Sequence, residues 1–160
     1  MTRKIELLTA YDAAWDREWE SLQSVLKHLT EEEARYQHPA YSEEPLEDGH
    51  PPAGTVLWYI VHLPHCYRHY ADIIRQRPNK PEDPHPPESN SVEEALANLQ
   101  HDRTELRNTI ATLSEEELDE KLYYGGTVPD LVRGTVRHDA WHAGQIAVAR
   151  RLYRMRGRHG

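Results

Sequence analysis

Phenylalanine is absent from this chain of 160 residues, and cysteine occurs only once, as Cys66. Without phenylalanine, any aromatic part of the core must come from tryptophan and tyrosine, whose polar atoms need hydrogen-bond partners when buried. A single cysteine excludes an intrachain disulfide and agrees with a reducing compartment. We therefore expect a cytoplasmic protein, and at this length we expect a core large enough to fold without a disulfide.

Long hydrophobic runs and a positive net charge are also missing. No run approaches the about 18 apolar residues that a membrane span needs, and residues 1–16 have no apolar core of a secretory signal. The net charge is −8 with histidines counted as neutral, which disfavours nucleic acids because their binding requires neutralisation of phosphates. We expect neither a membrane nor a nucleic acid as partner. The basic segment 150–158 is interpreted as a helix end whose cations complement the helix dipole, followed by a solvated tail.

Apolar residues recur at three- and four-residue spacing in four segments, which predicts helices over 9–29, 55–77, 92–113 and 130–155. Short helical turns are expected after Thr30, with Glu33 completing a capping box, and over 114–118. Pro64 lies inside the second helix, where a proline removes a backbone hydrogen bond and tends to kink the helix. The apolar stripe of the first helix comprises Leu8, Tyr11, Trp15, Trp19, Leu22, Leu26 and Leu29.

Four long helices predict an all-α fold, a four-helix bundle formed by residues 1–160 as a single domain. The proline-rich connection between the second and third helices is the longest between the main helices. A connection of this length can cross the end of a bundle, so the second and third helices are expected to run the same way, in an up-down-down-up arrangement. No β alternation is evident, apart from two or three residues near Thr127.

Eleven histidines are an unusually large number, and two of them, His138 and His142, stand four residues apart in the segment RHDAWHAGQI. At 100° per residue they lie 40° apart on one helix face. We expect that face, which includes Trp141 and Gln145, to be buried, because the arginines of the segment lie on the other side. Two adjacent neutral imidazoles need partners, and one divalent metal ion would satisfy both. The alternative is a pair of core histidines bonded to backbone carbonyls or to Tyr and Glu side chains.

A third ligand must come from elsewhere, and the segment VHLPHCYRHY of the second helix offers His62, His65, Cys66 and His69 on one face. Spacing does not decide among them. His62 comes first on the stripe, His65 and His69 form an i,i+4 pair, and Cys66 would supply a thiolate. We favour a partly exposed face for His65 and His69, and a small buried hydrophobe for Cys66.

Three neighbours of the histidine pair allow more than one role. HDAWH is one methylene short of the metalloprotease motif H-E-x-x-H, which would make Asp139 a general base. Asp139 projects 100° away from His138, so we favour a carboxylate on the helix surface or one that orients a ligand ring. Gln145 could bind a substrate or a ligand, although we favour an amide satisfied by a neighbouring helix. Gly144 is expected to permit a close helix approach.

The segment TVLWYIVHL, the proline-rich crossover and the C-terminal RHDAWHAGQI together resemble the DinB-like superfamily. This superfamily includes bacillithiol S-transferase-type proteins and the metal-binding domain of mycothiol-dependent maleylpyruvate isomerase. The resemblance covers nearly the whole chain in layout and implies an up-down-down-up bundle that forms a homodimer. It also implies a zinc or nickel ion bound by His62, His138 and His142. Pro64 is not a residue that the family leads us to expect, and the family name does not imply DNA binding.

The three-histidine pattern and the resemblance lead to the hypothesis of a metal-dependent transferase. Such a protein activates a low-molecular-weight thiol, which then attacks a small electrophilic substrate. No catalytic side chain and no organic cofactor is assigned, and whether the chain is an enzyme is left open. The alternatives are a non-enzymatic metal-binding stress-response protein and, less favoured, a metal-dependent hydrolase that uses Asp139.

Overall fold

The computed structural model describes residues 2–18, 21–39, 51–85, 89 and 91–156, and these residues are helical apart from turns and connections. The order is α1 (Arg3–Asp16), α2 (Leu22–Leu26), α3 (Glu31–Arg35), α4 (Val56–Gln76), α5 (Val92–Ala111), the 3-10 helix η1 (Glu117–Asp119) and α6 (Val128–Met155). Within the described part, β pairing is limited to one bridge between Lys121 and Thr127. The all-α prediction is confirmed.

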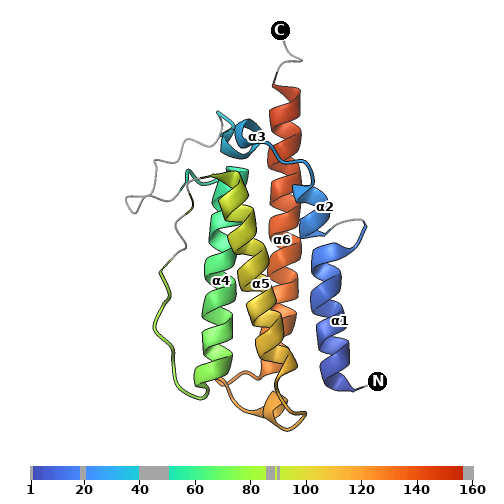
Figure 1. The fold of residues 1–160 in the computed structure, drawn as a ribbon, viewed down its shortest axis with the longest axis vertical. Helices are drawn as coiled ribbons and strands as arrows, with labels where there is room; N and C mark the ends of the chain where they lie inside the picture. The colour runs from blue at the N-terminus through green and yellow to red at the C-terminus, as the bar shows by residue number, and fades with distance from the viewer. Residues whose placement is uncertain (1, 19–20, 40–50, 86–88, 90, 157–160) are drawn as a thin grey trace.

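The long helices lie roughly parallel to one axis (Figure 1). In this view α1 and α6 run upward, while α4 and α5 lie side by side and run downward. Residues 77–85 leave the foot of α4 and rise along its outer side toward the start of α5. None of the helices in the described part is long and apolar enough to cross a membrane.

The first predicted helix, 9–29, has the wrong bounds, because the structure breaks it into α1 and α2. α1 begins before the predicted start and ends at Asp16. Ser21 then begins a new helix: its hydroxyl accepts a hydrogen bond from the Ser24 N–H, and Ser24 Oγ accepts one from the Ser21 N–H. Such local side-chain bonds compete with a continuous helix, and apolar spacing does not reveal them. Trp19 lies outside the described residues.

The short helical turn predicted after Thr30 is confirmed as α3, and the Thr30 hydroxyl accepts a hydrogen bond from the Glu33 N–H at 3.2 Å. The Glu33 side chain, however, does not serve the predicted capping box. It points inward and binds Arg150 at 2.8 Å and Arg154 at 3.1 Å. Arg150 belongs to the predicted helix end of the basic segment 150–158, but it is buried in an ion pair and is only 5% exposed. Its guanidinium also donates to the backbone oxygens of Val25 and Lys27.

The second predicted helix agrees with α4 to within one residue at each end, and α4 continues through Pro64. The crossover after it is tied back to α4 by Asp83, whose Oδ1 lies 3.2 Å from His69 Nδ1 and 4.0 Å from His65 Nε2. Both rings are partly exposed, as expected. They face the crossover and not the interior of the protein.

Among the described residues, tyrosines supply the fully buried aromatic side chains, whereas the absence of phenylalanine alone had left both tyrosine and tryptophan as candidates. Tyr11 and Tyr67 are both 0% exposed. Each has a hydrogen-bond acceptor on another helix: Tyr11 Oη donates to the Arg103 backbone oxygen at 3.1 Å, and Tyr67 Oη donates to Asp139 Oδ1 at 2.8 Å. The polar atoms of this core are satisfied across helix boundaries, so these bonds help to set how the helices pack.

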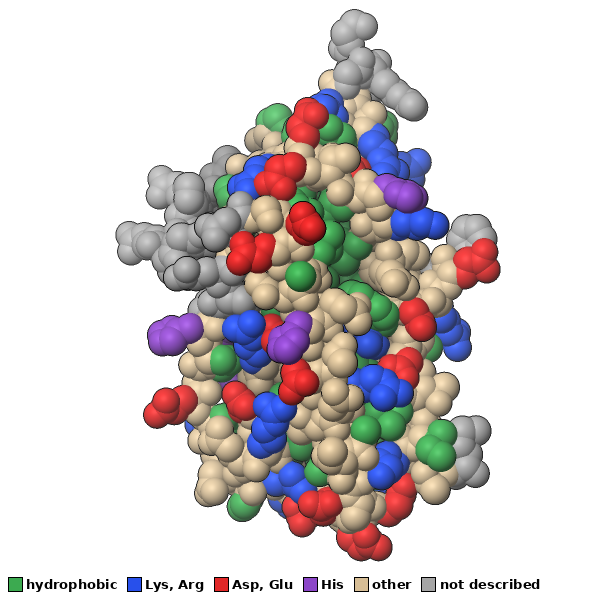
Figure 2. Space-filling model, in the orientation of Figure 1, with side chains coloured by type: hydrophobic (Ala, Val, Ile, Leu, Met, Phe, Trp, Pro, Cys, Tyr) green, Lys and Arg blue, Asp and Glu red, His purple; other side chains and the backbone are tan. Residues whose placement is uncertain are grey.

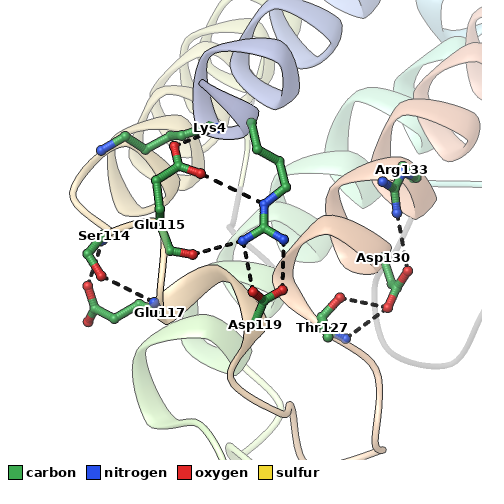
Figure 3. A network of polar contacts seen from close by, with 9 residues as sticks. Lys4, Ser114, Glu115, Glu117, Asp119, Thr127, Asp130 and Arg133 are labelled. Carbon is green, nitrogen blue, oxygen red and sulfur yellow. Dashed lines mark hydrogen bonds and ion pairs between the residues drawn. The ribbon is translucent and has the colours of Figure 1, made fainter. Parts of the chain in front are cut away.

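Ion pairs and caps hold the lower end of the helices together (Figure 3). Arg3 in the first turn of α1 donates to Asp119 of η1 at 2.8 Å and to the backbone oxygen of Glu115 at 2.8 Å. Beside it, the Asp130 carboxylate accepts from the N–H and the hydroxyl of Thr127 at the start of α6. Acidic and basic side chains are interspersed over the face shown in Figure 2 and do not form one large patch of a single charge sign. The described side chains of that face form no continuous basic surface of the kind that binds nucleic-acid phosphates.

Candidate metal centre

The structure brings His62 of α4 together with His138 and His142 of α6. One ring nitrogen from each residue lies within 4.8 Å of the other two. His142 Nε2 and His138 Nε2 are 2.9 Å apart. The three histidines that the resemblance selected therefore converge from two helices that are far apart in the sequence.

Two tryptophans flank these rings. The Trp58 ring stacks on His62, with centroids 4.6 Å apart and an interplanar angle of 14°. The Trp141 ring stacks on His142, with centroids 5.2 Å apart and an angle of 21°. The sequence interpretation did not assign Trp58 a role, although its position four residues before His62 places it one helical turn away on the same face.

Burial keeps the α6 pair neutral. It lowers the pKa of His138 to about 4, and the neighbouring His142 adds to the effect. Burial also lowers the pKa of His142, against the opposing effect of its hydrogen bond to Gln145. Near pH 7 both imidazoles are therefore uncharged, and this is the form that offers a nitrogen lone pair to a metal.

The three nitrogens fit a divalent ion. Zinc–nitrogen bonds of about 2.0–2.1 Å place two nitrogens of a tetrahedral site about 3.3 Å apart. The 2.9 Å separation of the α6 pair and the 4.8 Å limit for the whole group bracket that value.

Gln145 holds the ring of His142. Its Oε1 lies 2.7 Å from His142 Nδ1, and a carbonyl oxygen in this position accepts a hydrogen bond from a protonated Nδ1. That tautomer leaves the lone pair on Nε2, which faces His138. The favoured interpretation of Gln145, an amide satisfied by a neighbouring helix, is therefore wrong. Gln145 forms its hydrogen bond with His142, a candidate metal ligand on the same helix. A hydrogen-bond partner of this kind fixes both the orientation and the tautomer of the imidazole ring.

Asp139 is not on the helix surface. It is 0% exposed, and its Oδ1 accepts the hydrogen bond from Tyr67, while its Oδ2 is buried without a partner in the described part of the chain. Burial raises the pKa of Asp139 to about 7, although the Tyr67 bond and the charge of Arg103 act to lower it. Its hydrogen-bond partner lies in the core and not in the histidine cluster, so the geometry does not favour the general base of a hydrolase.

The burial pattern of α6 explains why Asp139 is buried although the sequence placed it on the helix surface. Asp139 and Ile146 are both 0% exposed, whereas Trp141, expected on the buried face, is 64% exposed. The buried stripe is therefore rotated relative to the stripe inferred from the arginines, because α6 packs against α1 and α2 as well as α4. The histidines lie at one edge of this stripe, beside open space, and not at its centre.

Cys66 lies next to the cluster but outside the group of three. Its Sγ is 3.4 Å from His62 Nε2. Burial raises the pKa of the Cys66 thiol to about 12, so the sulfur is protonated near pH 7 and is not a thiolate ligand in this state.

The histidine cluster opens into a cavity of about 270 Å³ whose lining includes His62, His138, His142 and Trp58. A second cavity of about 450 Å³ adjoins it, and Gly54, Tyr59, Trp141 and Gln145 line both. Gly144 borders the larger cavity, and a Cβ added there would meet no atom within 4 Å. The predicted close helix approach at Gly144 is therefore wrong, because this glycine faces open space.

The comparison with known families agrees with this layout. The family model described as the DinB superfamily matches residues 14–146, which include all three histidines. Comparisons with curated proteins and with solved structures found no match.

Proposed function

The chain belongs to the DinB superfamily, and on this premise we propose that it binds one divalent metal ion, zinc or nickel, through His62, His138 and His142. We propose further that the bound ion activates a low-molecular-weight thiol for transfer to a small electrophile. The observation that supports metal binding most directly is the convergence of three ring nitrogens within 4.8 Å. The adjoining cavities leave room for substrates beside these rings.

The side chains of the site have separate tasks in this proposal. His62, His138 and His142 hold the ion, Gln145 keeps Nε2 of His142 free of a proton, and Trp58 and Trp141 hold two of the rings by stacking. A divalent ion held by three neutral imidazoles keeps an open position and lowers the pKa of a thiol bound there. In this proposal the attacking sulfur comes from the substrate thiol, and Cys66 has no assigned role.

We also propose how the four long helices are arranged. We interpret α1, α4, α5 and α6 as the four members of an up-down-down-up bundle, in which the residues after α4 form the long crossover. The directions of these helices in Figure 1 support this interpretation. The homodimer that the resemblance implies stays a prediction, and light scattering of the purified chain will test it.

Metal content is the first test. Untagged protein is expected to contain about one zinc or nickel ion per chain by elemental analysis, and His62→Ala, His138→Ala and His142→Ala are each expected to lose most of it, because two imidazoles bind a divalent ion much more weakly than three. His101→Ala, a change at an exposed histidine of α5, is the control and should keep the metal. Equal metal content in all four variants would contradict the site.

Turnover is the second test. Metal-loaded protein is expected to consume bacillithiol, mycothiol or glutathione in the presence of a panel of small electrophiles, and His138→Ala is expected to be inactive. Stoichiometric metal without consumption of any of these thiols would refute the transferase proposal. That outcome would instead favour a metal-binding protein without enzymatic activity.

A further inference from the structure

The larger of the two cavities has the size and the lining of a ligand site. Its volume of about 450 Å³ falls within the range of small-molecule pockets, about 300–1,000 Å³. A cavity of about 150 Å³ is enough to hold benzene, so this one has room for a group of two fused rings. Its apolar lining comes from Tyr36, Tyr59, Trp141, Val148, Ala149 and Leu152.

Two of these side chains are large and apolar and yet largely exposed to solvent. Trp141 is 64% exposed and Val148 is 55% exposed. They stand seven residues apart on α6, which places them on the same face two turns from one another. Apolar side chains grouped around a concave surface gain free energy when a ligand removes them from water.

The cavity lining also has few ionisable side chains in the part of the chain that the structure describes. Neither cavity is lined by any Asp, Glu, Lys or Arg side chain from this part. The polar groups come from tyrosine and histidine rings and from Gln145, which lies where the two cavities meet. A carboxylate placed in the larger cavity would lose water without gaining a lysine or arginine as partner, and such burial is costly.

We propose that this cavity binds an uncharged aromatic group of about two rings, which belongs to the small molecule that reacts beside the histidine cluster. The part of this proposal that places the reaction beside the histidines depends on the proposed function. The affinity for the uncharged group rests only on the cavity. The site therefore discriminates against substrates that would place an anionic group along α6.

Gly144 provides a way to fill the cavity without disturbing the fold. A side chain added there meets no atom within 4 Å of its Cβ and would occupy the cavity. Gly134 offers a matched control, because it lies on the same helix, also has no atom within 4 Å of an added Cβ, and lines neither cavity. Both changes to leucine remove a helical glycine, so both should keep or raise helix stability.

The experiment uses the neutral fluorescent probe N-phenyl-1-naphthylamine with the full chain, metal-free and zinc-loaded. Wild type and Gly134→Leu are expected to bind one probe per chain with equal affinity, whereas Gly144→Leu should bind it about tenfold more weakly or worse, a loss of at least about 1.4 kcal/mol. Equal binding by both leucine variants, or no saturable binding by wild type, would overturn the proposal. Circular dichroism melting shows that the variants are folded.

The charge preference has its own test in the metal-free protein. 2-Naphthylmethanol is expected to displace the probe at about tenfold lower concentration than 2-naphthoate. Val148→Lys, which adds a cation at an exposed position of the rim, is expected to reduce or reverse this preference. Preference for the carboxylate in wild type would refute the assignment of an uncharged ligand.

Two further measurements separate this inference from its alternatives. Zinc content should be the same in wild type, Gly134→Leu and Gly144→Leu, because no histidine is changed. Loss of probe binding with zinc retained supports the cavity, whereas probe binding by a wild type that binds no metal would refute the proposed function alone. A change of molecular mass by light scattering in Gly144→Leu, but not in Gly134→Leu, would assign this face to a second copy of the chain and overturn the ligand proposal.

Discussion

One hydrogen bond decides which nitrogen of His142 faces the candidate site. Gln145 Oε1 accepts from His142 Nδ1 at 2.7 Å and thereby leaves the Nε2 lone pair toward His138. The bond is short and half-buried, so it competes well with water. Gln145 therefore acts on the metal through His142, whether or not it also contacts a substrate.

Gln145→Leu is expected to weaken metal binding about 10–100-fold, because it keeps the size of the side chain but removes the acceptor that orients His142. Competition with a chelator of known affinity measures the change. Gln100→Leu on the exposed side of α5 is the control and should bind metal as wild type does. An unchanged affinity in Gln145→Leu would show that the ring is oriented by its packing against Trp141.

A second hydrogen bond, between Tyr67 and Asp139, lies in the core. The Tyr67 hydroxyl donates to Asp139, a carboxyl whose pKa burial raises to about 7. Tyr67→Phe leaves that buried group without this bond and is expected to cost about 1–3 kcal/mol of unfolding free energy. The loss should be larger at pH 8.5, where the carboxyl is ionised, than at pH 5.5, where it is protonated. Urea unfolding at both values, with Tyr123→Phe at an exposed position as control, measures it.

At the scale of helices, the short α3 is held against the long α6 by one buried ion pair. Glu33 is 4% exposed and Arg150 is 5% exposed, and their charged groups lie 2.8 Å apart. Burial alone would raise the pKa of Glu33, but the hydrogen bonds and charges of Arg150 and Arg154 outweigh it and lower the pKa. A helix of five residues has little stability of its own, so its position depends on this pair.

Glu33→Gln is expected to destabilise the protein by about 3–5 kcal/mol at pH 7, because it leaves Arg150 buried without an opposite charge. Glu32→Gln is the matched control on the same helix. Glu32 is exposed and, within the described residues, pairs with Arg156, so its loss should cost about 0–1 kcal/mol. Chemical unfolding of both variants gives the comparison, and equal losses would contradict the special role of Glu33.

The pH dependence of the same pair has a defined sign. The pKa of Glu33 is lower in the folded than in the unfolded protein. The pair therefore stabilises the protein above the ordinary carboxyl pKa, and the contribution is lost as pH falls through the lowered folded value. The difference in stability between wild type and Glu33→Gln should accordingly be full at pH 7 and should shrink at acidic pH.

At the scale of the whole molecule, the candidate site joins α4 to α6 and thus connects the first half of the chain to the second. A ligand that binds only the folded state stabilises it, by about 2.7 kcal/mol at a concentration 100 times its dissociation constant. Removal of metal with EDTA is therefore expected to lower Tm, and added zinc should restore it. The Tm of His138→Ala should not respond to EDTA or to zinc. An equal rise of Tm with zinc in that variant would mean that the ion binds elsewhere.

Much of the fold could be predicted from local patterns. The bounds of α4 and α5 follow from apolar spacing and from the caps at Thr55 and Ser91. The break between α1 and α2 could not be predicted in the same way, because the bonds of Ser21 compete with an apolar stripe that continues past it. Short-range polar bonds of this kind change the helix without changing the hydrophobic pattern.

The three histidines that cluster in the candidate site were named from the sequence and the family resemblance, but their surroundings were not predictable. His138 and His142 share a face by helix geometry alone, whereas the selection of His62 over His65 and His69 rested on the family resemblance. The structure supplies a physical reason for this selection, since Asp83 of the crossover faces His65 and His69 on the outer side of α4. The surface position of Asp139, the neighbouring-helix partner of Gln145 and the close helix approach at Gly144 were predicted wrongly, because each depends on which neighbour occupies the adjacent space.

The sequence by itself determined the helical class, an aromatic core without phenylalanine and the pairing of two histidines on one helix face, because these follow from composition and from the periodicity of a helix. Only the tertiary structure decided how far α6 is rotated in its packing. That rotation buries Asp139, leaves Trp141 exposed and opens the cavity beside Gly144. It depends on contacts with α1, α2 and α4 together, and such long-range contacts leave no mark in the spacing of a single helix.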